Sequence, residues 1–333
     1  PASTESIREA GLGLYNASYL QTGGDSQDHY VFNIRRSTID LLGALAESDL
    51  GTPSFADLFF NFERALSSSR SLSANLLWFG DDVKINNSSG TESADATYGN
   101  TYLWFTLATE HSEMRSSESR VSFTAIKDDR DGSVIKPGLV SGQLIEDKEF
   151  RVYALEHKEN ITFNRSLMTL GATYRYLAAE YGSQSTLDIN PRYSHFSNFP
   201  RAASQQTDIT EYGQQIALYA SIKHRFSNHW FAELGIRVDA QDYITSDFTD
   251  QVMPRLSLLY LVPNAGELRW SWGEFSQSQG IHELDIADGI TSFQRPQKSK
   301  HLVLSYKQNF QYLDIRIEAY RKDAEETNFY FEN

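Results

Sequence analysis

The side chains in this chain that could bind a metal or catalyse a reaction rarely stand at the spacings that a metal site or an active site requires. Residues 128–132, Asp-Asp-Arg-Asp-Gly, alternate acids and end in glycine as a calcium-binding loop begins, but the glutamate that completes such a loop is absent. We expect a solvated turn instead. His282-Glu283 is not followed by a second histidine one helical turn later, so the zinc-protease signature is incomplete and we expect a pair of loop residues.

Other candidate sites fail on similar grounds. The glycines at 11, 13 and 23–24 lack the following Lys-Ser/Thr of a phosphate-binding loop. Acid pairs at 81–82 and 325–326 fall in predicted loops, where solvation explains them. The chain has no cysteine, which excludes disulfides and thiolate metal sites. No nucleophile and base stand at an interpretable spacing, so we expect no cofactor, no metal and no enzymatic activity.

Four charged residues are candidates for ligand binding, because each lies on the polar side of a segment with alternating polar and apolar residues. They are Glu233, Arg237, Arg269 and Arg316. In a β-strand, successive side chains project to opposite faces. Residues 231–239, Phe-Ala-Glu-Leu-Gly-Ile-Arg-Val-Asp, therefore place Glu233 and Arg237 on the face opposite the apolar groups. Such a surface could bind an anionic ligand. The alternative, which we favour, is a charge-balanced wall that contacts another part of the protein.

The elements that carry these side chains are predicted to be about fourteen long antiparallel strands joined by alternating short turns and long loops. Strands of about 10 to 16 residues exceed the about 5 or 6 usual in a soluble sandwich and can cross a bilayer. Alternation of turns and loops is typical of a membrane barrel. Aromatic side chains stand near strand ends on the apolar face, as in an interfacial girdle: Tyr176, Trp230, Trp270, Trp272 and Tyr306.

Hydrocarbon cannot satisfy backbone polar groups, so strands that cross it must close into a barrel. We therefore predict an all-β, transmembrane antiparallel β-barrel with short periplasmic turns and long extracellular loops. The residues expected to face lipid are Ile216, Leu218, Leu234, Ile236, Ile315 and Ile317. The residues expected to face the lumen are Glu233, Arg237, Arg269, Arg316 and Glu318. The formal net charge of −14 argues against nucleic acid as a partner, because phosphate binding needs clustered Lys and Arg.

The predicted order of elements begins with strands over residues 7–20 and 29–42. Long loops are predicted at residues 82–97, 128–147, 182–210 and 276–298, and a tight turn near residues 116–117. Counted back from the short turns, the first predicted strand runs toward the periplasm. We therefore expect an ascending strand to be missing before it.

Two stretches near the C-terminal end carry a family resemblance. Residues 279–284, Gln-Gly-Ile-His-Glu-Leu, are followed by Arg-Pro-Gln-Lys-Ser at 295–299 and by a hairpin that ends Glu-Ala-Tyr-Arg-Lys-Asp at 318–323. Residues 253–257, Met-Pro-Arg-Leu-Ser, look like a strand start of the same kind. Together these segments resemble the barrel of TonB-dependent outer-membrane receptors, most specifically over residues 211–333.

The resemblance implies a barrel of about 22 strands with an N-terminal plug inside it. It implies that residues 1–333 are a partial barrel domain of about fourteen strands, without the plug, the first strand or the last several strands. The implied function is capture of a scarce nutrient of the ferric siderophore, cobalamin or carbohydrate class, followed by import with TonB-derived energy. The long loops at 182–210 and 276–298 would contribute to the binding site.

The same resemblance implies the location and the partners. The protein would lie in the outer membrane of a Gram-negative cell, in contact with lipid and lipopolysaccharide. It would be inserted by the barrel-assembly machinery, bind a small-molecule ligand, and be driven by TonB, ExbB and ExbD through the missing plug. One alternative is a self-contained passive channel of about fourteen strands. Another is a soluble β-rich binding protein or glycan hydrolase.

Overall fold

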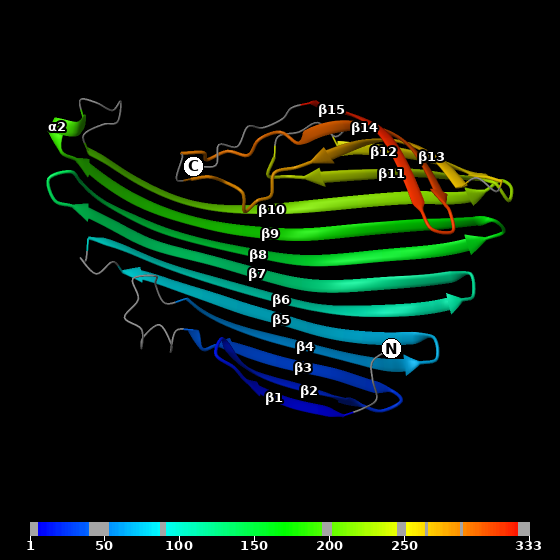
Figure 1. The fold of residues 1–333 in the computed structure, drawn as a ribbon, viewed down its shortest axis with the longest axis horizontal. Helices are drawn as coiled ribbons and strands as arrows, with labels where there is room; N and C mark the ends of the chain where they lie inside the picture. Colours follow the sequence, from blue (N-terminus) through cyan, green and yellow to red (C-terminus); the bar gives the residue numbers. More distant parts are fainter. Residues whose placement is uncertain are drawn as a thin grey trace.

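The computed structural model describes residues 6–39, 53–86, 91–194, 202–244, 251–263, 266–286 and 289–325. They form one curved sheet of 15 strands in which every strand pairs antiparallel with its neighbour in sequence (Figure 1). A short helix, α2 (Pro191–Ser194), lies between β9 and β10. No helix in these ranges is long and apolar enough to span a membrane. The all-β antiparallel prediction is confirmed.

The strands have the following bounds: β1 (Ile7–Leu12), β2 (Asn16–Gly24), β3 (Asp28–Ser37), β4 (Ser54–Ser67), β5 (Arg70–Asn86), β6 (Glu92–Ser112), β7 (Arg115–Lys136), β8 (Val140–Phe163), β9 (Ser166–Ile189), β10 (Ala202–Arg225), β11 (Trp230–Gln241), β12 (Val252–Val262), β13 (Gly266–Gln277), β14 (Gln297–Asn309) and β15 (Asp314–Glu325).

Alternation along each strand divides the sheet into a convex apolar face and a concave polar face. In the β10–β11 pair, Leu218 lies opposite Val238, and Tyr219 lies opposite Arg237. Paired residues project to the same face, so Leu218 and Val238 share one face while Tyr219 and Arg237 share the other. On the apolar face Leu218 and Leu234 are each 54% exposed. A soluble core would bury such side chains, so the outward apolar face predicted from the sequence is confirmed.

The connections alternate between the two ends of the strands. At one end, three pairs are joined by only two residues each, at 68–69, 113–114 and 164–165. These turns gather on the right of Figure 1. At the other end lies the connection 278–296, between β13 and β14. Short turns at one end and a long connection at the other agree with the predicted alternation, although the tight turn expected at 116–117 lies at 113–114 and residues 137–139 form a short link at the long-connection end.

Three of the predicted long loops are largely strand. The five strands β6 to β10 contain 21 to 24 residues each, well beyond the about 9 to 11 needed to cross a bilayer. Residues 128–132 therefore lie inside β7 rather than in a turn, and β7 and β8 are joined by residues 137–139 alone. The sequence prediction was wrong here because both faces mix polar and apolar residues in these extensions, with adjacent apolar pairs such as Val134-Ile135 and Leu144-Ile145, which removes the period-two signal.

The first predicted strand is also wrong, because residues 7–20 fold back on themselves. They form β1 and part of β2, with Ile7 paired to Thr22 and Leu12 paired to Ala17. The chain therefore contains the ascending strand that was expected to be missing, and this strand is β1. In the described part of the chain, β1 and β15 each have one neighbour and form the two edges of the sheet. The end of the second predicted strand, beyond residue 39, lies outside the described residues.

A close contact on the concave face supports a stability prediction. A Cβ built on Gly171 would lie 2.1 Å from the ring of Tyr219, its partner on β10, whereas one on Gly235 would meet nothing nearer than 3.5 Å. We expect Gly171→Ala to lower the free energy of unfolding of the full-length protein by about 1–3 kcal/mol through overpacking. Gly235→Ala should be neutral or stabilising. Urea titration of the heat-modifiable folded band measures both, and equal effects would contradict the packing argument.

Candidate functional site on the concave face

All four charged residues singled out from the sequence lie on the concave face. Glu233 pairs with Lys223 and with Ser257, and Arg237 pairs with Tyr219 and with Met253. Arg269 lies between Leu259 and Ser305, and Arg316 lies opposite Lys307. The register places Glu233, Arg237 and Arg269 on β11 and β13 along two adjoining hollows, whereas Arg316 on β15 lines neither hollow. Their role in ligand binding stays a prediction.

Three of these four charges already have partners. Lys223 Nζ lies 3.5 Å from a carboxylate oxygen of Glu233, Arg237 Nε lies 2.9 Å from one of Asp239, and Arg316 pairs with Glu318 at 2.5 Å. The side chain of Arg269 makes no hydrogen bond or ion pair with any residue that the structure describes. Among the four charged residues, Arg269 is therefore the one whose guanidinium N–H groups are available to another molecule.

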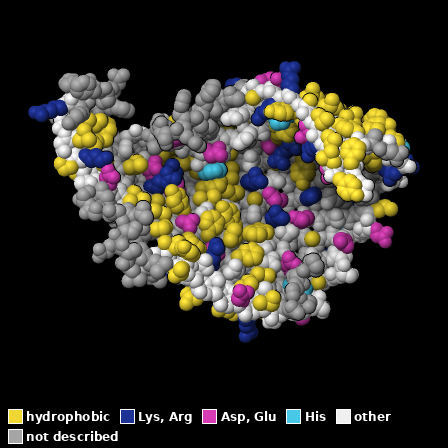
Figure 2. All heavy atoms as spheres, viewed as in Figure 1, with side chains coloured by type: hydrophobic (Ala, Val, Ile, Leu, Met, Phe, Trp, Pro, Cys, Tyr) yellow, Lys and Arg dark blue, Asp and Glu magenta, His cyan; other side chains and the backbone are white. Residues whose placement is uncertain are grey.

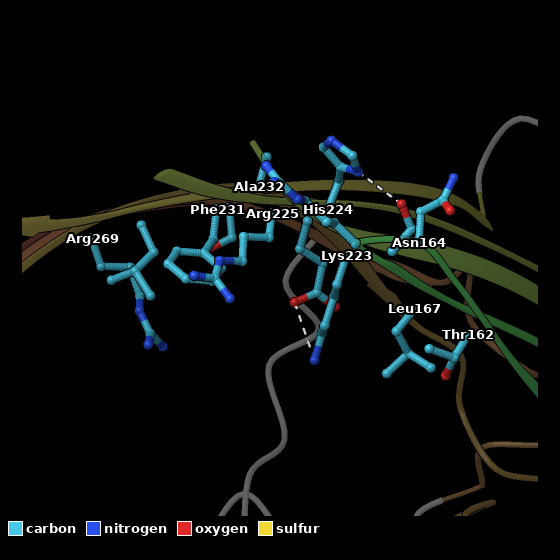
Figure 3. A pocket seen from close by; sticks show the side chains of 14 residues that line it. Thr162, Asn164, Leu167, Lys223, His224, Arg225, Phe231, Ala232 and Arg269 are labelled. Atoms are coloured by element: carbon cyan, nitrogen blue, oxygen red, sulfur yellow. Dashed lines mark hydrogen bonds and ion pairs between the residues drawn. The ribbon is translucent and has the colours of Figure 1, made fainter. Parts of the chain in front are cut away.

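Arg269 lines a hollow of about 510 Å³ near the short turns (Figure 3). The other basic side chains of this hollow are Arg165, Lys223 and Arg225, and Glu233 is its acid. The walls are apolar at Phe231 and Leu259. In Figure 3, His224 projects to the side of the sheet opposite Lys223, as strand alternation requires. The hollow is a shallow surface with an excess of positive charge.

A second hollow of about 460 Å³ shares Glu233 with the first. Arg237, Arg255 and His301 contribute its basic groups, and the guanidinium of Arg255 lies 4.7 Å from the ring centre of Phe275. Sequence reasoning missed Arg255 as a companion of the predicted residues, although it stands on the polar face of its strand, two positions before Ser257. In the view of Figure 2, basic and acidic side chains are interspersed over the half of the sheet nearer the short turns.

The connection 278–296 crosses the other half of the concave face. Ile281, Leu284 and Ile286 from this connection are at most 3% exposed and pack against a group on β9: Leu177, Ala179 and Tyr181. In Figure 1 the orange segment after β13 descends to β10. The prediction of a loop at residues 276–298 is confirmed, and the structure shows that it is held to distant strands. The predicted loop at 182–210 is mostly strand, and its residues 195–201 lie outside the described part.

Two phenols, the buried Tyr181 and the half-buried Tyr243, hold this connection in place. Tyr181 Oη donates to the carbonyl of Ile281 at 2.5 Å and accepts from the amide of Leu284 at 3.3 Å. Tyr243 Oη donates to the carbonyl of Gln279 at 3.3 Å. Burial raises the pKa of each phenol to about 12, so both stay protonated donors at physiological pH. Gly213 leaves room for the contact, because its Cβ would lie 2.4 Å from Tyr243.

His282 and Glu283 serve this connection structurally. A Glu283 carboxylate oxygen accepts from the amide of Gly280 at 2.8 Å, and the His282 ring lies 4.8 Å from that of Phe150. Among the described residues, no group of three or more His, Cys, Asp or Glu side chains could hold a metal ion. The pair therefore orders the turn of the connection, in agreement with its interpretation as loop residues.

Aromatic rows mark two levels on the convex face. Tyr153, Tyr176 and Tyr212 form one row, with successive ring centres 6.3 and 6.4 Å apart. Toward the long connections the next outward side chain of β8 is Arg151, which pairs with Glu180 at 3.2 Å. Near the short turns Trp230 and Tyr260 lie 4.6 Å apart. This arrangement is typical of the two interfacial girdles of a membrane barrel.

Residues 8–327 match the family described as TonB dependent receptor-like, beta-barrel. The chain belongs to this family. TonB-dependent receptor barrels are Gram-negative outer-membrane proteins. A comparison with curated proteins finds no match.

Solved structures of TonB-dependent receptors have the same fold. FpvA of P. aeruginosa bound to a heterologous pyoverdine has a TM-score of 0.65 at 9% identity, over 92% of this chain and 46% of FpvA. The siderophore receptor PiuA of Acinetobacter baumannii has 0.63 at 10%, over 95% of this chain and 56% of PiuA. The RagAB peptide transporter has 0.62 at 8%, over 93% and 44%. The chain thus spans about half the length of these proteins.

The attachment of connection 278–296 can be tested by proteolysis. We expect Tyr181→Phe to expose Glu283 to a Glu-specific protease about fivefold faster, because it removes a hydrogen bond worth about 1 kcal/mol. Tyr176→Phe, on the convex face of the same strand, is the control and should leave cleavage unchanged. Cleavage at Glu283 at the same rate in both variants would show that Tyr181 does not hold the connection.

Proposed function

We propose that the complete protein is an outer-membrane receptor that imports a scarce nutrient with energy derived from TonB. The family match over residues 8–327 carries this proposal. TonB, ExbB and ExbD would act through a plug domain against the concave face. The charged wall with Arg255, Arg269 and Glu233 supports such a contact, because a soluble plug meets a lumen through polar groups rather than apolar ones.

A transport role, rather than an enzymatic one, fits the absence of a nucleophile–base pair in the sequence. The connection 278–296 lies above the charged wall and offers Phe293, His282 and its backbone to a ligand that enters from the long-connection side. We propose a ferric chelate as the class to test first, because FpvA was solved as an iron–pyoverdine complex and PiuA is a siderophore receptor. Peptide, cobalamin and carbohydrate are the competing classes.

The remaining proposed partners follow from the position of the sheet in a membrane. Lipid would cover the convex face between the aromatic rows, lipopolysaccharide would meet the long outward extensions of β6 to β10, and the barrel-assembly machinery would insert the chain. The passive-channel alternative requires β1 and β15 to pair, and the described residues show no such pairing.

Uptake of radiolabelled iron chelates by cells with and without the gene tests the proposal. Loss of uptake both on deletion and on inactivation of TonB is the expected result. Uptake that needs the gene but persists without TonB would support the passive channel instead. If no iron chelate depends on the gene, peptides, cobalamin and oligosaccharides are compared in the same pair of strains.

The available donors of Arg269 give a second test. We expect Arg269→Gln to reduce energy-dependent uptake several-fold, because an ion pair or hydrogen bond to a plug or ligand would be lost. Arg316→Gln is the matched control, since Arg316 lies on the same face, is 66% exposed and already pairs with Glu318. Both variants should reach the outer membrane at equal levels. If the two lower uptake equally, the charge of Arg269 has no special role.

A further inference from the structure

The apolar belt of the convex face is interrupted on β6, β7 and β8 near the short turns. Ser119 pairs with Leu107 on one side and with His157 on the other, and Ser117 pairs with Thr109 and with Glu159. These residues share the parity of Val121 and Leu155, which are 55% and 53% exposed on the convex face. Polar side chains therefore point outward here.

The interruption is a connected group, which we call the polar wedge: His111, Arg115, Ser117, Ser119, His157 and Glu159. Arg115 forms an ion pair with Glu159, Ser119 and His157 hydrogen bond at 2.9 Å, and His111 and Ser117 hydrogen bond at 2.8 Å. The side chain of Arg115 is 54% exposed. The wedge begins at the turn 113–114 and points into the belt.

The depth of the wedge places it where other strands are apolar. Ser119 is the fifth residue of β7, and Leu234 is the fifth residue of β11, which also starts at a short turn. Leu234 is outward and 54% exposed. On β9 the outward neighbours of His157 and Glu159 are Ala172 and Leu170. The wedge is thus flanked by hydrocarbon-facing residues at its own level.

The belt is correspondingly short on β8. Its outward apolar residues between Arg151 and His157 are Tyr153 and Leu155. The distance along the strand from Arg151 to His157 is about 20 Å, which is about 14 Å of membrane depth after a tilt of about 45°. On β10 the outward run from Gln214 to His224 spans about 33 Å, or about 23 Å after the same tilt. The apolar band of an outer-membrane barrel is about 25 Å tall. Only the β10 side matches a full bilayer.

We propose that the polar wedge binds phospholipid headgroups of the leaflet on the short-turn side and thins the bilayer against β6–β8. A charged side chain is costly in hydrocarbon, and a bilayer thins where the apolar span of a protein is short. On β7 the wedge reaches the turn at 113–114, and headgroups lie at that edge. It offers cationic and hydrogen-bonding groups to a phosphate, and Glu159 to an ammonium, which matches the two charges of a zwitterionic headgroup.

Site-directed spin labelling of the full-length protein in phosphatidylethanolamine–phosphatidylglycerol vesicles tests the proposal. Residues 1–333 contain no cysteine, so once any cysteine elsewhere in the full-length protein is replaced by serine, a label at Ser119→Cys reports on the wedge and one at Leu234→Cys reports on the intact belt at matched depth. We expect collisions with a water-soluble nickel chelate to be several-fold more frequent at position 119, and collisions with oxygen to be less frequent. Equal values at the two positions would overturn local thinning. Exclusion of both reagents at position 119 would indicate a second copy of the protein and overturn headgroup binding.

Filling the wedge provides an independent readout. The variant Arg115→Leu/His157→Leu/Glu159→Leu extends the belt, so its resistance to urea should rise in long-chain relative to short-chain phosphatidylcholine, compared with the parent protein. An unchanged preference for chain length would count against the proposal. If this variant does not fold, Ser119→Leu makes the smallest change of the same kind, and the spin-label comparison does not depend on either variant.

Discussion

Backbone hydrogen bonding without water is the constraint on which this structure depends. Each interior strand from β2 to β14 is hydrogen-bonded to both of its neighbours along at least part of its length, in an order that follows the sequence without a crossover. Once the ladder is fixed, every side chain is assigned to one of two faces. The outward exposure of Leu218 and the inward position of Arg237 are consequences of the same register. The two faces of such a sheet meet different surroundings.

The ladder continues beyond the membrane, and this determines where specificity can be built. Above the row of Tyr153 and Tyr176, β8 and β9 carry Arg151 and Glu180 outward, while their inward face remains apolar at Leu177 and Ala179. That inward apolar surface is covered by the connection from β13. Nearer the short turns, the inward face is charged instead. The concave surface thus has two levels. The level farther from the short turns is apolar and is covered by connection 278–296, and the level nearer the short turns is charged and contains the two open hollows.

Sequence reasoning succeeded where one physical period dominates and failed where none does. The alternation around Glu233 and Arg237 identified the inward face of β11 correctly, because one side of that strand is apolar. Residues 128–147 mix polar and apolar side chains on both faces, so these parts of β7 and β8 were mistaken for a loop. The reversal at residues 13–15 was missed inside the first predicted strand. The proximity of Arg255 to Arg237 could not be read at all, because it depends on the register of strands joined by ten intervening residues, 242–251.

The bond between Tyr181 and Ile281 joins positions 100 residues apart. Contacts of such separation form late, because loop closure must precede them. Connection 278–296 can reach β9 only after β10 to β13 have formed and curved the sheet enough to bring the end of β13 near β9. The contact between this connection and β9 therefore forms only in the curved sheet. A chain that stalls as a flat ribbon would leave Ile281, Leu284 and Ile286 uncovered, and these side chains would then be available to chaperones that recognise unfinished outer-membrane proteins.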